Sequence, residues 1–163
     1  MIRRIKNIVL WWDTGAAILG ATVFYFSVDG KVTANFAKDV VSVGISVLSI
    51  VFSLFFASLT FIISSSNDEF VEFLVENQHY QNIIWAFKWT LGALFLSLSY
   101  SLVFYVHISY IPKQSSPIHL IWLMEGFIFL FTYSLVASGF STNDAIKYAK
   151  RRARFISMSG DEE

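Results

Sequence analysis

Four long apolar runs alternate with short polar segments along this chain. The runs cover residues 8–28, 40–65, 83–111 and 118–140. A helix needs about 20 residues to cross the hydrocarbon core of a bilayer, so each run is long enough for one crossing. The pattern therefore predicts an all-α integral membrane protein, a single four-helix transmembrane domain over residues 1–163. A polar linker at 66–82 and a charged tail at 141–163 complete it.

The second run carries small and hydroxylated residues along one side. They recur at steps of three or four, the period of one face of an α-helix: Ser42, Ser46, Ser49, Ser53, Ala57, Thr60 and Ser64. Lipid contact gives no reason for such a stripe. Close packing against another helix does, because small side chains let backbones approach and hydroxyls bond across the interface. Lining a hydrated path between subunits is the alternative.

The third run repeats this pattern and ends before a proline, which cannot continue a helix interior. Its small and hydroxylated residues again follow a helical period: Ala86, Thr90, Ala93, Ser97 and Ser101. Two such stripes in one chain can pack closely against each other. We therefore expect the third helix to meet the second along these two stripes.

The distribution of basic residues predicts the orientation in the membrane. Eight lie near the two ends of the chain, which four crossings place on one side: Arg3, Arg4, Lys6, Lys147, Lys150, Arg151, Arg152 and Arg154. The opposite loops hold three, Lys31, Lys38 and Lys113. Cytoplasmic loops carry the excess of Lys and Arg, so both termini are expected in the cytoplasm. The first run, interrupted early by Asp13, favours a retained anchor helix over a cleaved signal peptide.

Three charged residues fall inside the predicted spans. Asp13 and Lys88 each lie about five residues from the cytoplasmic end of a span, so they sit at similar depth. We expect either a structural ion pair between them or two separate side chains that reach the membrane interface. A conduction role is the less favoured alternative for this pair. Glu125 is deeper in the fourth span. A carboxyl at that depth is either a functional group or a protonated one that is hydrogen-bonded to a neighbouring serine.

The linker at 66–82 has the pattern of a short amphipathic helix. Ser66 and Glu69 have the spacing of a capping box, and Phe70, Phe73 and Leu74 follow at helical spacing. Another face is acidic, with Glu69, Glu72 and Glu76. Helices that lie on anionic lipid are usually basic, so this one favours contact with a protein partner over lipid. A solvated connector between two spans is the alternative. In the tail, the partner-binding candidates are Lys150, Arg151, Arg152 and Arg154.

Composition narrows the remaining functions. Only 15% of the residues are charged, against about 25% in soluble domains, which agrees with a membrane protein. There are no cysteines, so thiolate chemistry is excluded. His79, His107 and His119 are scattered without metal-ligand spacing, and no phosphate-binding loop or nucleophile elbow occurs. We expect no enzyme, cofactor or metal site. The basic tail is explained by anionic lipid, so no direct binding of nucleic acid is expected.

The layout resembles a known family of small membrane proteins. A second span that ends in Ala57-Ser58-Leu59-Thr60-Phe61-Ile62-Ile63-Ser64, followed by a polar cytoplasmic helix, resembles KwaA, the membrane subunits of Kiwa anti-phage defence systems. RexB phage-exclusion proteins are a looser match. The first resemblance implies a homo-oligomer in the bacterial inner membrane that binds a cytoplasmic effector; the second implies an ion-conducting pore.

Three hypotheses follow from the residues and the resemblance together. The first is a membrane-embedded sensor or scaffold of an anti-phage defence complex, which oligomerises and recruits a cytoplasmic protein. The alternative is an oligomeric channel that depolarises the membrane. A small subunit with no activity of its own is the third reading.

Overall fold

The computed structural model describes residues 2–28, 32–64, 79–115 and 117–159. These residues form four α-helices: α1 (Ile2–Ser27), α2 (Ala34–Ser64), α4 (His79–Ser109) and α5 (Ile118–Ser159). The predicted all-α class is confirmed. Among the described residues, three helices contain stretches that are long and apolar enough to cross a membrane, Ala34–Thr60, Trp85–Ser109 and Ile118–Lys147.

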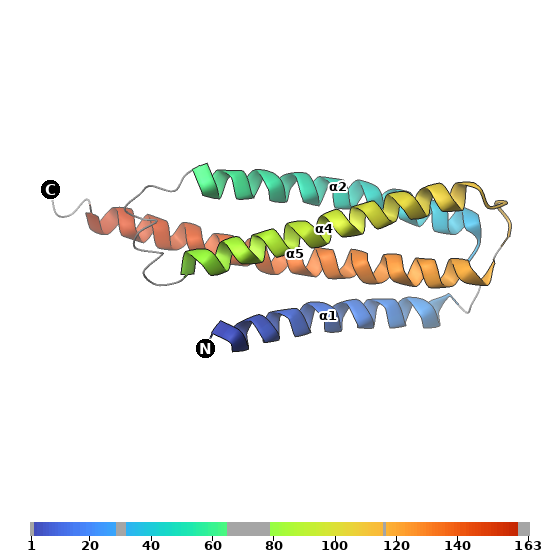
Figure 1. The fold of residues 1–163 in the computed structure, drawn as a ribbon, viewed down its shortest axis with the longest axis horizontal. Helices are drawn as coiled ribbons and strands as arrows, with labels where there is room; N and C mark the ends of the chain where they lie inside the picture. The colour runs from blue at the N-terminus through green and yellow to red at the C-terminus, as the bar shows by residue number, and fades with distance from the viewer. Residues whose placement is uncertain (1, 29–31, 65–78, 116, 160–163) are drawn as a thin grey trace.

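The helices form an elongated bundle in which α1 and α4 run in one direction and α2 and α5 run in the other (Figure 1). Helix α5 is central, because it packs against α1, α2 and α4. Helices α2 and α4 also pack against each other, whereas α1 packs chiefly against α5. The bundle therefore has a three-helix core of α2, α4 and α5, with α1 added along one side of α5.

All four helices extend beyond the apolar runs that predict them. Helix α4 begins at His79, inside the predicted linker, and α5 continues without a break from Ile118 to Ser159, through the predicted tail. The segment 141–159 contains no Gly or Pro, so nothing in it terminates a helix. Hydropathy marks where a helix is apolar, and backbone hydrogen bonding continues past that point.

Helix α2 also begins earlier than the apolar run at 40–65, because its first turn is capped. The Thr33 hydroxyl accepts a hydrogen bond from the Phe36 amide at 3.4 Å. The amides of Ala34 and Asn35 donate to the carbonyls of Ser115 and Lys113, at 3.1 and 3.2 Å. The first amides of a helix have no partner within it, and here the loop between α4 and α5 supplies two acceptors.

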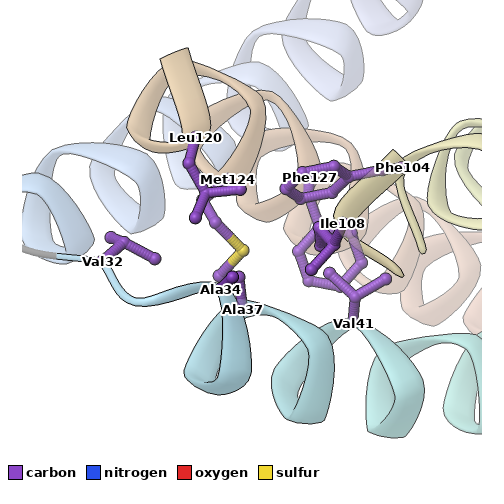
Figure 2. Packing of buried hydrophobic residues seen from close by; sticks show 9 residues of the cluster. All are labelled: Val32, Ala34, Ala37, Val41, Phe104, Ile108, Leu120, Met124 and Phe127. Atoms are coloured by element: carbon purple, nitrogen blue, oxygen red, sulfur yellow. The ribbon is translucent and has the colours of Figure 1, made fainter. Parts of the chain in front are cut away.

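The main apolar core lies at the end of the bundle where the α4–α5 loop meets the start of α2. Buried side chains from three helices and from Val32 converge there (Figure 2): Val32, Ala34, Ala37, Val41, Phe104, Ile108, Leu120, Met124 and Phe127. Met124 points toward Ala34 and Ala37, whose small side chains leave room for it. A second cluster, Leu48, Phe55, Phe87 and Leu94, continues the core along the bundle.

Candidate functional site

The hydroxylated stripe of α4 lies inside the bundle. Thr90, Ser97 and Ser101 are all almost completely buried. The Thr90 and Ser141 hydroxyls are 2.6 Å apart, and Ser134 donates to the Ala93 carbonyl at 3.2 Å, so both bonds join α4 to α5. Ser101 donates to the carbonyl of Ser97 at 2.6 Å. We call Thr90, Ser97, Ser101, Ser134 and Ser141 the buried hydroxyl row.

The hydroxylated stripe of α2 faces away from the core of the bundle. Ser42, Ser46, Ser53 and Thr60 are exposed and Ser49 is half-buried, and these five residues are called the α2 hydroxyl face. The buried residues of this helix, among them Val41, Leu48 and Phe55, lie on its opposite side. The expected pairing of the two stripes is therefore wrong. Large apolar side chains of α2 fill the core, and the partner of the α4 stripe is α5.

Most hydroxyls on the α2 face bond within their own helix. Ser46 donates to the Ser42 carbonyl at 3.1 Å, Ser53 to the Ser49 carbonyl at 2.9 Å, and Thr60 to the Phe56 carbonyl at 3.0 Å. These bonds let the hydroxyls face an apolar environment without a large desolvation cost. They also leave a smooth, narrow surface along the helix, suited to close approach of another helix.

The predicted ion pair between Asp13 and Lys88 is not formed. Asp13 is only 4% exposed and shares a face of α1 with Ala17, which is fully buried, and with Gly20, which meets Thr132 of α5. Lys88 is exposed on α4. The prediction of a pair is wrong because α1 packs against α5, which holds Asp13 away from the exposed surface of α4.

Some of the other predicted residues lie on α5, and the rest lie outside the described residues. Glu125 is half-buried on α5, and Lys150 is exposed on the same helix. Arg151, Arg152 and Arg154 belong to α5, but their side chains are not described. The acidic residues of the linker, Glu69, Glu72 and Glu76, lie outside the described residues, as does most of the predicted linker helix.

The structure also brings together residues that sequence spacing does not connect. The rings of His107 and His119 lie 5.7 Å apart, because a short loop reverses the chain between α4 and α5. The Trp89 indole donates to the Tyr133 hydroxyl at 2.9 Å. Within the part of the chain that the structure describes, no three His, Cys, Asp or Glu side chains gather into a group able to hold a metal ion.

No family model, curated protein or solved structure matches this chain. The class that the fold and these residues define is a small helical bundle with three helices long and apolar enough to cross a membrane, a buried row of hydroxyls and an exposed hydroxyl face. The resemblance to KwaA and RexB stays a prediction from sequence.

Proposed function

We propose that this protein is a membrane-embedded scaffold subunit that self-associates and recruits a cytoplasmic protein. The observation that carries the proposal is the exposed α2 hydroxyl face. It lies opposite the packed side of α2, along a helix apolar enough to span the membrane. In lipid, helices gain little from hydrophobic association, and small or hydroxylated faces are where they pack most closely. A second copy of the chain fits this face.

In this proposal all four helices cross the bacterial inner membrane and both termini are cytoplasmic. The excess of basic residues at the two ends supports this orientation. The α1–α2 connection and the α4–α5 loop would then share the outer side, which agrees with the alternating directions of the helices (Figure 1). Anti-phage defence is the role implied by the resemblance to KwaA.

Recruitment is assigned to two charged segments on the cytoplasmic side. Helix α5 continues beyond the ends of the other helices (Figure 1), so its basic segment is carried on a regular helix. Positions 147, 150, 151 and 154 recur at the spacing of one helical face. The acidic linker, with Glu69, Glu72 and Glu76, supplies charge of the opposite sign. Together they suit a soluble partner that carries both acidic and basic surface patches.

The test of self-association is purification in mild detergent with mass determination of the complex. We expect a discrete oligomer, and we expect Ser46→Leu with Ser53→Leu to lower its mass, because branched side chains block close approach of the helices. Ser58→Leu is the matched control, since Ser58 is also exposed on α2 but lies away from the hydroxyl face. A monomeric wild-type protein would refute the proposal.

The test of recruitment uses the same preparation. Replacement of Glu69, Glu72 and Glu76 by lysine is expected to abolish co-purification of the cytoplasmic partner while the oligomer remains. Unchanged recovery of the partner would remove the linker from the proposal.

A channel is the second candidate, favoured by the same exposed hydroxyl face. The buried hydroxyl row is enclosed by α4 and α5 within one chain, so a conducting path would run between copies, lined by α2. This candidate predicts ion flux in liposomes that Ser49→Leu blocks. A protein without flux would exclude it and leave the scaffold role standing.

A further inference from the structure

Asp13 is buried on α1, the helix that packs against α5, and one of its carboxyl oxygens has no hydrogen-bond partner among the described residues. The residue is 4% exposed, and the oxygen without a partner is Oδ1. Gly20 of α1 lies next to Thr132 of α5, and the two helices run in opposite directions. A residue seven positions before Gly20 therefore lies at the level of the residue seven positions after Thr132. This register brings Asp13 to the level of Gly139, which has no side chain to donate a hydrogen bond.

No charge on α5 compensates Asp13 at this level. From Leu135 to Asn143 the helix carries no ionisable side chain. The hydroxyls of Ser138 and Thr142 already donate to the carbonyls of Leu135 and Ser138, both at 2.8 Å.

Ionisable groups toward this end of α1, α4 and α5 are paired with each other, exposed, or have side chains outside the described part. Asp144 and Lys147 of α5 pair with each other at 3.0 Å. Lys88 of α4 is exposed and forms no ion pair with Asp13. On α1 itself, Lys6 lies about two turns before Asp13 and its side chain is outside the described part.

An ionised carboxylate without a partner is too costly to bury in this interface, whereas a neutral carboxyl is tolerated. We propose that Asp13 binds a proton when α1 is packed against α5, and that loss of this proton releases α1 from α5. The proton is the ligand of this site, and the movement of α1 is the response. This inference goes beyond the scaffold role and does not depend on it.

The direction of the pH dependence follows from counting protons. The packed state holds one more proton than the released state whenever the freely hydrated Asp13 is ionised, so acid favours packing and alkali favours release. For one proton, the ratio of packed to released α1 changes at most about tenfold per pH unit. Such a helix would make the scaffold responsive to the proton concentration at the cytoplasmic face.

The test measures the distance between α1 and α5 by pulsed electron spin resonance in lipid nanodiscs from pH 5 to pH 9. The chain has no cysteines, so spin labels attach only to introduced ones. Leu19→Cys and Ile146→Cys place the labels on exposed positions of α1 and α5. These positions are about 20 Å apart along the helix axis at 1.5 Å per residue. Dilution with unlabelled protein removes distances between copies.

We expect one short distance at pH 5 and a growing population of longer distances as the pH rises. Asp13→Asn, which stays neutral at every pH, is expected to keep the short distance throughout. Asp39→Asn is the matched control, an exposed aspartate on α2, and is expected to behave like the wild type. A wild-type distance that does not change with pH would overturn the proposal, and so would an unchanged pH response in Asp13→Asn. The wild-type series decides the matter even if the Asn variant does not fold.

Discussion

At the scale of single residues, Gly44 of α2 allows a close approach between α2 and α5. A Cβ atom built at Gly44 would overlap Cζ of Phe127, at a separation that real Cβ atoms essentially never show. Phe127 cannot easily retreat, because it is buried and stacks on Phe131 at 5.7 Å between ring centroids. The ring of α5 therefore occupies the space that a side chain at this position of α2 would fill.

Gly44→Ala is expected to lower the free energy of unfolding by about 1–3 kcal/mol, the usual cost of overpacking a filled core. Gly92→Ala is the control, since a Cβ there meets nothing within 4 Å. It is expected to be neutral or to stabilise by up to about 1 kcal/mol, because alanine favours the helix over glycine. Unfolding by denaturing detergent measures both. Equal effects in the two variants would contradict this account of Gly44.

Sequence periodicity identifies which residues share a helix face, but not which neighbouring helix that face contacts. Steps of three and four identified the hydroxylated faces of α2 and α4, and Thr90, Ser97 and Ser101 do share one buried face. The period does not say which neighbour a face meets. Small residues serve a core interface in α4, where α5 supplies Ser134 and Ser141 as partners, and an outer surface in α2. Only the packing of the whole bundle separates these two uses.

At the scale of helices, the contact between α1 and α5 is specific enough to be cross-linked. A Cβ atom built at Gly20 lies 3.6 Å from Cβ of Thr132. Disulfides form when Cβ atoms are about 3.5–4.5 Å apart. Gly20→Cys with Thr132→Cys is therefore expected to form an intramolecular disulfide in this cysteine-free chain, seen as a mobility shift on non-reducing gels. Gly15→Cys with Thr132→Cys is the control and should stay reduced, because a Cβ at Gly15 meets nothing within 4 Å.

Helix number and approximate position follow from apolar runs, whereas helix ends do not. The runs at 40–65, 83–111 and 118–140 all lie within α2, α4 and α5, apart from a residue or two at their ends. The start of α2 at Ala34 depends on acceptors in a loop about 80 residues away in sequence, which no local pattern contains. The burial of Asp13 likewise depends on α5, which is distant from it in sequence.

At the scale of the whole molecule, the two ends of the bundle are held together differently. At one end, the amides of Ala34 and Asn35 bond to the α4–α5 loop, and the larger buried cluster fills the space beside it (Figure 2). Toward the other end, the described residues form a smaller buried cluster, Leu48, Phe55, Phe87 and Leu94. Regions with more buried apolar contacts and more backbone hydrogen bonds are the last to unfold locally.

Hydrogen exchange is therefore expected to be graded along the bundle axis. In detergent, the amides of Ala34 and Asn35 should exchange at least tenfold more slowly than those of Leu59 and Thr60, near the other end of α2. Mass spectrometry of peptides after timed labelling measures this difference. Equal protection at both ends of α2 would contradict it.

The hydrogen bonds between the start of α2 and the α4–α5 loop have a mechanical consequence. They connect the start of α2 to the loop between α4 and α5. The three core helices are therefore held together at this end of the bundle. If the helices separate, the distance between them should increase away from this end, and a movement at the far end should cause only a small movement here. A protein that bound the projecting end of α5 would therefore move the helices most at the end farthest from these hydrogen bonds. The loops at the opposite end of the bundle would remain nearly still.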